Sequence, residues 1–213
     1  MNLYTFPNAR LIIFAKAPLS GYCKTRLIPE LGQEGAAQLQ AELIENCLRR
    51  LCLKPICPTE LWCSPDTQHP IFQSLSHRYG VTLHQQQGTS LGEKMHQAMA
   101  CQDGPMTIIV GTDCPEITCE YVTAAFRYLS EGQDAVIGPA EDGGYVLLGL
   151  QRVSQTLFHD INWGTEQVYS QTVEKMKDLE LTWREHDLLW DLDDGQDLLR
   201  YQRLKMRQVQ ETC

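Results

Sequence analysis

The chain has 213 residues, of which 43% are hydrophobic and 21% are charged, and its formal net charge is −9 at pH 7. An acidic chain of this kind is poorly suited to non-specific binding of nucleic acids or acidic membranes, so its local cations must serve a local anion. The longest apolar runs are too short to span a bilayer, and the N-terminus lacks the charged start and apolar run of a signal peptide. We therefore expect a cytoplasmic protein with no membrane span and a single domain over residues 1–213.

Apolar strands alternate with helices along the chain. In chain order we expect strand 10–16, helix 35–53, strand 59–65, helix 70–79, strand 81–86, helix 90–100, strand 106–113, helix 119–130, strands 134–140 and 144–150, a helix from Thr165, a strand near 181–186 and a final helix. Continuous apolar strands between helices predict an α/β fold with a mainly parallel central sheet and helices on both faces.

Polar residues follow several of the expected strands. In sheets of this class, ligands bind where loops leave the carboxyl ends of the strands. Lys24 and Arg26 come after the first strand, "QQGTSLGEKM" after the third, Asp113 at the end of the fourth and "EDGG" after the fifth. These four groups are therefore the candidates for a functional site.

The loop after the first strand, "FAKAPLSGYCKTRL", combines Gly21 with the cations Lys24 and Arg26. It is not a P-loop, because that motif has glycine directly before the lysine, and the chain contains no G-x-G of a dinucleotide-binding fingerprint. A flexible turn with exposed amides and two cations can neutralise a diphosphate. A solvated basic turn is the alternative, and the strand-end position favours a functional role.

Two acidic stretches are candidate metal ligands. Asp113 ends an apolar strand, where one carboxylate can hold a divalent cation that bridges phosphate oxygens. It lies too early to cap the helix that starts near Thr118. In "LLWDLDDGQD", Asp194 is a plausible N-cap of the last helix, which leaves Asp191 and Asp193 on one side at strand spacing. Such an acidic loop is usually only solvated, and its interest depends on whether it folds back beside Asp113.

In "PAEDGGYVLLGL", two consecutive glycines between apolar strands indicate a hairpin or a close backbone approach. Asp142 in this turn can accept a hydrogen bond from a substrate hydroxyl or simply form the turn. The nine cysteines show no C-x-x-C spacing, which favours reduced thiols packed as small apolar groups over a zinc or redox site. The histidines show no triad with a nucleophile.

Six stretches in order, "FAKAPLSGYCKTRL", "GTSLGEKM", "GTDCP", "PAEDGGYVLLGL", "INWGTEQV" and "WDLDDGQDL", resemble the motifs of the DUF2064 family, also called rSAM/selenodomain-associated transferase 1. This family belongs to the nucleotide-diphospho-sugar transferase superfamily, so the resemblance implies a GT-A-like fold. It runs from about Phe14 to Leu198. The chain departs from the superfamily in two places. Thr112 and Val110 replace the usual Asp-x-Asp, and the first loop lacks the Gly-rich run that ends in Arg and Lys.

The resemblance also implies roles for individual residues. Catalytic roles fall to Lys24, Arg26 and Asp142. Nucleotide binding falls to Ala15, Lys16, Gly21, Lys24, Gln87, Gly88, Thr89 and Thr112, with Gln87, Gly88 and Thr89 at the nucleobase. The sugar or acceptor would lie beside Gly143, Gly144, Trp163 and Thr165. Mg²⁺ or Mn²⁺ would be held by Asp113 and, as second ligand, Asp193.

These features predict a metal-dependent transferase that uses a nucleoside triphosphate or a nucleotide-sugar and a small-molecule acceptor. The lone aspartate after Thr112, together with a distant resemblance to 2-phospho-lactate and molybdenum-cofactor guanylyltransferases, favours nucleotidyl transfer, whereas the family name favours glycosyl transfer. The alternative is a nucleotide-binding module without turnover, which would keep Lys24 and the nucleobase loop but need no metal. The presence of both Asp113 and Asp193 argues against that alternative.

Overall fold

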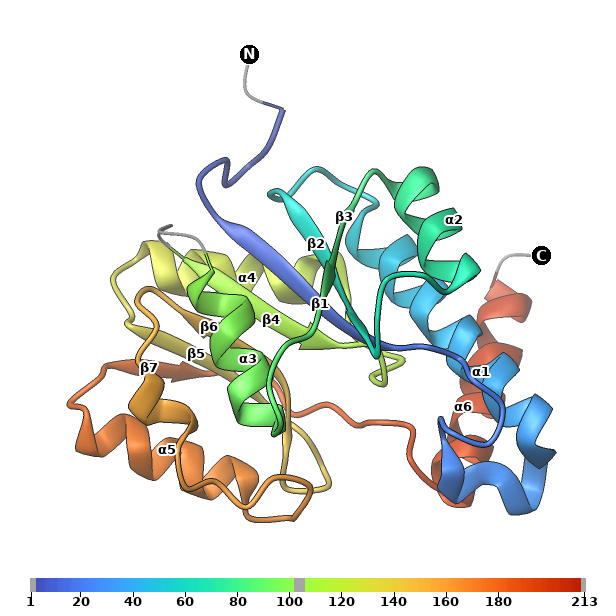
Figure 1. Cartoon of the computed structure of the whole chain (residues 1–213). Helices are drawn as coiled ribbons and strands as arrows, with labels where there is room; N and C mark the ends of the chain where they lie inside the picture. The colour runs from blue at the N-terminus through green and yellow to red at the C-terminus, as the bar shows by residue number, and fades with distance from the viewer. Residues whose placement is uncertain (1–2, 102–105, 212–213) are drawn as a thin grey trace.

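One seven-stranded sheet forms the centre of the molecule (Figure 1). The structure is a computed structural model that describes residues 3–101 and 106–211. The strands are β1 Arg10–Lys16, β2 Thr59–Ser64, β3 Thr82–Gln85, β4 Thr107–Gly111, β5 Ala135–Pro139, β6 Tyr145–Leu150 and β7 Trp183–Glu185. Their order across the sheet is β3-β2-β1-β4-β6-β5-β7. Only β6 runs antiparallel to its neighbours, β4 and β5, because a short hairpin turn joins it to β5. The mainly parallel sheet predicted from the sequence is confirmed.

The helices are α1 Ile28–Leu51, α2 Pro70–Tyr79, α3 Leu91–Ala100, α4 Cys119–Ser130, α5 Val168–Asp178 and α6 Gly195–Glu211, with short 3₁₀ helices at Thr25–Leu27 and Gln155–Phe158. Two differ from the sequence prediction at their starts. Residues before position 35 form an extra turn of α1, which is kinked at Gly32 with φ 69°. The stretch that begins at Thr165 becomes regular helix only at Val168.

Helices cover both faces of the sheet. Successive side chains of β1 point to opposite faces, so they pack alternately in two apolar cores. Leu11 and Ile13 pack in the core formed with α1, α2 and α4. Ile12 packs in the core formed with α3 and α5, where Met95 and Met176 are buried. Because both faces of β1 are buried, its sequence is a continuous apolar run. Within the described ranges, no helix has both the length and the apolar character that a membrane crossing requires.

A third apolar cluster connects α1 with the C-terminal segment of the chain. Leu43 of α1 packs with Trp190, Leu192 and Leu198 of the C-terminal segment, and α6 lies beside α1 (Figure 1). The backbone N–H of Leu192 donates to the carbonyl of Asp113 at 2.9 Å. The acidic segment therefore folds back onto the end of β4.

The topology creates a crevice at the carboxyl ends of β1 and β4. β1 is paired in parallel with β2 on one side and with β4 on the other. From β1 the chain continues toward β2 at one end of the sheet, and from β4 it continues toward β5 at the other end. The strand order therefore reverses between β1 and β4, and ligands bind at such places in open α/β sheets. Two of the candidate groups, the loop that carries Lys24 and the stretch that carries Asp113, start at this crevice.

A buried ion pair lies under α3 on the face of β1 and β2. Arg10 and Glu60 are each 5% exposed and form a two-bond contact of 2.8 and 2.9 Å. The guanidinium also donates to the carbonyls of Ala98 and Met99, and the Trp62 indole donates to Glu60. Burial alone would raise the pKa of Glu60, but the hydrogen bonds from Arg10 and Trp62 outweigh it and hold the pKa below its usual value.

Glu60→Ala should lower the free energy of unfolding by about 3–5 kcal/mol, because it leaves a buried guanidinium without its partner. Urea denaturation at neutral pH measures this. Glu120→Ala is the matched control, since it removes the exposed pair with Lys54 and should change little. Because the pKa of Glu60 is depressed when folded, its contribution is present above the ordinary carboxyl range and is lost as the pH falls through the folded value. A difference between wild type and Glu60→Ala that does not shrink in acid would contradict this assignment.

Candidate active site

Two cavities lie side by side along the carboxyl edge of the sheet. We call them the lysine cavity, of about 450 Å³, and the tryptophan cavity, of about 440 Å³, after Lys24 in the first and Trp163 in the second. Both are lined by Phe14, Arg26, Leu91, Gly111 and Asp193. Because they share these walls, a molecule bound in one cavity directly adjoins a molecule bound in the other.

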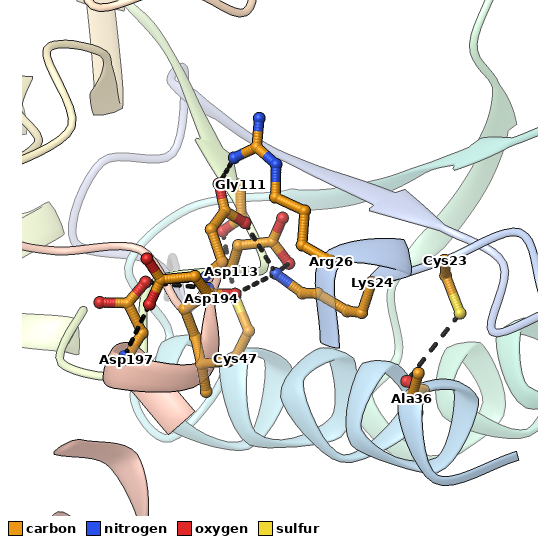
Figure 2. A network of polar contacts seen from close by, with 11 residues as sticks. Cys23, Lys24, Arg26, Ala36, Cys47, Gly111, Asp113, Asp194 and Asp197 are labelled. Carbon is orange, nitrogen blue, oxygen red and sulfur yellow. Dashed lines mark hydrogen bonds and ion pairs between the residues drawn. The ribbon is translucent and has the colours of Figure 1, made fainter. Parts of the chain in front are cut away.

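The loop after β1 delivers Lys24 into this edge (Figure 2). Lys24 has a left-handed backbone, with φ 45° and ψ 43°, at the start of the short helix Thr25–Leu27. Its side chain is only 4% exposed. The ammonium lies 3.0 Å from Oδ1 of Asp113 and 3.3 Å from Oδ1 of Asp193, and it donates to the carbonyl of Leu192 at 2.5 Å. Its three protons therefore face three oxygen acceptors.

Carboxylates keep the buried Lys24 protonated. Burial alone would lower its pKa, but the charges of Asp113 and Asp193 outweigh burial and raise the pKa above its ordinary value. Both carboxylates are less deeply buried than the lysine, with side chains 43% and 40% exposed. A protonated lysine is thus held between two acids that remain open to the cavity.

The same carboxylates fit a divalent cation. Oδ1 of Asp113 is buried and has no hydrogen-bond partner, although it lies within ion-pair distance of Lys24. Two carboxylate oxygens thus converge on one cationic group, and Mg²⁺ commonly takes one or two protein carboxylates and completes its shell with phosphate and water. Among the residues that the structure describes, no group of three His, Cys, Asp or Glu is arranged to hold a metal ion. Asp113 and Asp193 would therefore need substrate oxygens to complete a metal shell.

Asp193 is positioned by the cap of α6. The carboxylate of Asp194 accepts hydrogen bonds from the backbone N–H groups of Gln196 and Asp197, at 2.8 and 3.1 Å. The carboxylate of Asp197 in turn accepts from the N–H groups of Asp193 and Asp194 (Figure 2). The predicted N-cap role of Asp194 is confirmed, and the reciprocal bonds fix the backbone that carries Asp193.

Asp191 was singled out in the sequence without a role, and it lines the tryptophan cavity. Burial, followed by the nearby charges of Asp113, Asp142 and Asp193, raises its pKa to about 8. Asp191 is therefore mainly protonated at neutral pH and can donate as well as accept a hydrogen bond.

Other residues assigned to the nucleotide divide into two groups. Ala15, Lys16 and Thr112 line the lysine cavity, as does Arg26, whose side chain is 72% exposed and lies 3.8 Å from Asp193. Gly21 is not among the lining residues. Its φ of 78° indicates a backbone role in the turn instead.

The predicted nucleobase stretch lies elsewhere. Gln87 lines a separate hollow of about 180 Å³, and Thr89 is hydrogen-bonded to Glu93 by both its N–H and its hydroxyl. Gly88 supports a tight backbone approach, since a Cβ there would lie 2.9 Å from the amide nitrogen of Lys94. None of the three lines either cavity.

The residue that reaches the lysine cavity from this stretch is Gln86. Its amide donates to the carbonyls of Ala15 and Trp62, at 3.3 and 2.8 Å. Successive residues of an extended chain point to opposite sides, so Gln86 lines the lysine cavity and Gln87 does not.

The "EDGG" turn is locked to the loop that carries Trp163. Gly143 has φ 85°, and a Cβ on it would lie 2.2 Å from the carbonyl oxygen of Glu166. The carbonyl of Gly143 accepts from the N–H of Tyr169 at 2.9 Å. Asp142 forms the turn by accepting from the N–H of Gly144 at 2.8 Å, and it also lines the tryptophan cavity. Gly144, Trp163 and Thr165 line this cavity, whereas Gly143 does not.

Most of the cysteines in the described ranges are packed as apolar groups, whereas Cys101 is exposed and accepts a hydrogen bond from Arg10. Cys47 and Cys63 belong to a buried core. Burial raises the pKa of the Cys57 and Cys114 thiols to about 12, which keeps them protonated. Cys213 lies outside the described residues.

Sequence reasoning missed the apolar walls of the two cavities. Phe14, Leu91, Met95 and Tyr145 all line the tryptophan cavity. In the sequence they are ordinary apolar positions of strands and helices, so no local pattern marks them.

The fold is that of the nucleotide-diphospho-sugar transferases, in a GT-A-like arrangement. The structure of a protein from Desulfovibrio desulfuricans G20, described as a candidate nucleotide-diphospho-sugar transferase, is 31% identical over 90% of this chain and 85% of that one, with a TM-score of 0.82. A family model described as an uncharacterized protein conserved in bacteria, DUF2064, matches residues 47–165. The chain belongs to the DUF2064 family.

More distant structures share the fold alone. CMP:2-keto-3-deoxy-manno-octonic acid synthetase, in complex with CTP, is 11% identical over 94% of this chain and 99% of that one, with a TM-score of 0.59. Glucosyl-3-phosphoglycerate synthase from Mycobacterium tuberculosis, in complex with Mn²⁺, UDP and glucosyl-3-phosphoglycerate, is 10% identical over 87% and 71%, with a TM-score of 0.54. Comparison with curated proteins gives no match.

Lys24→Met should lower the free energy of unfolding by about 1.5–3 kcal/mol, because it removes charged hydrogen bonds between three segments. Lys16→Met, at an exposed lysine of the same cavity, is the control and should change little. Since the pKa of Lys24 is raised on folding, its contribution is full below the ordinary lysine range and is lost as the pH rises through the folded value. Equal stability of the two variants in urea denaturation would argue against a structural role for Lys24.

Gly143→Ala should disrupt the turn, because the added Cβ meets the Glu166 backbone and the backbone is left-handed. We expect a loss of more than about 1 kcal/mol in thermal or urea unfolding. Gly132→Ala is the control, since Gly132 also has a positive φ but no atom within 4 Å of its Cβ position. A smaller loss for Gly143→Ala than for Gly132→Ala would contradict the contact.

Proposed function

We propose that this protein is a metal-dependent transferase that uses a nucleotide-activated donor and acts in the cytoplasm on small molecules. The observation that carries the proposal is the meeting of Lys24, Asp113 and Asp193 at the crevice between β1 and β4. They come from three segments far apart in the sequence, and the crevice is the ligand-binding place of this class of sheet.

In this proposal the lysine cavity takes the donor. Arg26 and Lys16 are exposed there and can contact phosphate oxygens from the cavity walls. Asp113 and Asp193 would hold Mg²⁺ or Mn²⁺, which when bound neutralises phosphate charge and stabilises a departing phosphate group. The ammonium of Lys24 already faces oxygen acceptors, so it would exchange a carboxylate for a phosphate oxygen as the donor enters.

The tryptophan cavity would take the acceptor, because it shares walls with the donor cavity. The nucleophilic oxygen of the acceptor would form a bond to the donor, either at the anomeric carbon with loss of a nucleoside diphosphate or at the α-phosphorus with loss of pyrophosphate. Its proton would pass to the carboxylate of Asp142, which lines the cavity. A binding module without turnover would need neither this second cavity nor Asp142 in its wall.

Support for a nucleotide donor also comes from the fold relatives. One of them was solved with CTP and another with Mn²⁺ and UDP. Those ligands belong to proteins of low identity, so the argument for this chain rests on its own cation and carboxylate cluster.

Nucleotide should stabilise the protein far more with Mg²⁺ or Mn²⁺ than with chelator. Ligand at about 100 times its dissociation constant adds about 2.7 kcal/mol to the free energy of unfolding. Thermal unfolding with CTP, UTP, GTP, ATP and UDP-glucose, each with metal or with chelator, measures the difference. Asp113→Asn should abolish the metal-dependent part, and Asp193→Asn should reduce it.

Asp187→Asn is the matched control, because the Asp187 side chain is 94% exposed and lines neither cavity. It should keep the full metal-dependent shift. The same shift in metal and in chelator for the wild type, with every nucleotide, would overturn the two-aspartate site.

A further inference from the structure

The tryptophan cavity is built mainly from apolar side chains. Met95, Ile109 and Val146 form buried parts of its wall, each 5% exposed or less. Tyr145 and Trp163 add half-buried aromatic rings. The volume of about 440 Å³ suits a small organic molecule rather than an ion.

The aromatic wall is held in place by close packing. The rings of Trp163 and Tyr145 meet edge to face with centroids 6.4 Å apart. A Cβ on Gly92 of α3 would lie 2.6 Å from the indole nitrogen of Trp163, so α3 accommodates the indole only because glycine is there. The indole is therefore a fixed surface for a ligand and does not need to be ordered on binding.

The polar part of the cavity is predominantly acidic. Asp142, Glu166, Asp191 and Asp193 contribute four carboxyl groups, and Arg26 is the one cation among the lining residues of the described chain. Arg26 is already within 3.8 Å of Asp193. An anionic group placed beside Asp142 and Glu166 would be repelled, whereas an uncharged or positive group would find hydrogen-bond acceptors there.

We propose that the acceptor bound in the tryptophan cavity has an apolar, ring-like body and presents a hydroxyl or amine, without a negative charge, to the acidic rim. This inference rests on the proposed function, which makes the molecule bound in this cavity the acceptor. A free sugar fits poorly, because its hydroxyl groups would lose water against Ile109 and Met95 without new partners. A phosphorylated or carboxylate acceptor fits poorly because of the rim.

The test uses three small probes on the purified full-length protein. Tyramine has an aromatic body and an ammonium, 4-hydroxyphenylacetate has the same body and a carboxylate, and glucose has neither. Calorimetry or ligand-observed NMR should show tyramine binding, with 4-hydroxyphenylacetate and glucose each about tenfold weaker or absent. This comparison needs no variant, so it stands even if a substitution destabilises the fold.

Trp163→Ala should weaken tyramine about fivefold or more, and Trp163→Phe should keep most of the affinity because it keeps an aromatic face. Trp183→Ala, which removes a half-buried indole outside both cavities, is the control and should bind like wild type. Absence of tyramine binding, binding of 4-hydroxyphenylacetate or glucose as tight as that of tyramine, or unchanged tyramine affinity in Trp163→Ala would overturn the proposal.

Nucleotide binding is measured in parallel, because Trp163 does not line the lysine cavity. If the protein binds nucleotide in a metal-dependent way but does not distinguish the three probes, the proposed class of acceptor is overturned and the donor site stands. Probe discrimination without nucleotide binding in the wild type upholds the cavity chemistry and overturns the donor site on which the proposed function depends.

Discussion

The ion pair between the Lys24 ammonium and the carboxylates of Asp113 and Asp193 holds the site together. It joins the loop after β1, the end of β4 and the segment before α6, which no local sequence preference would bring into contact. The lysine is nearly fully buried while both acids stay open, so the charge is compensated without closing the cavity. A buried charge that lost its partners would cost several kcal/mol, and this cost makes the arrangement specific.

The two cavities differ in a way that follows from their walls. The lysine cavity combines cations with two carboxylates, a set that suits phosphates together with a divalent metal. The tryptophan cavity has an apolar wall and an acidic rim, a set that suits an uncharged or cationic organic molecule. The chain carries a net charge of −9, and in the proposed function the cations of the lysine cavity offset this charge locally for an anionic donor. In the proposed function, two unlike substrates would meet at the residues that both cavities share without competing for the same place.

Much of this could be predicted from the sequence, for identifiable reasons. The apolar run of β1 and the Thr118 cap of α4 are local signals, and both elements were placed correctly. The strand-end rule identified Lys24 and Asp113, because the topology of parallel sheets places such positions at one edge. The sequence could not show that the acidic segment folds back, since this depends on Trp190 and Leu192 packing against α1. Nor could it fix which of two adjacent glutamines faces the cavity, because a single residue of register decides that.

We propose that Asp113 and Asp193 exchange Lys24 for a metal-bound nucleotide. Anomalous diffraction from crystals grown with Mn²⁺ and the best-stabilising nucleotide tests it most directly. We expect a manganese peak about 2.0–2.4 Å from an oxygen of each aspartate, with a phosphate oxygen in the same shell and the Lys24 ammonium moved onto the phosphates. A nucleotide bound elsewhere, or bound while Lys24 still bridges the two carboxylates with no manganese between them, would contradict the claim.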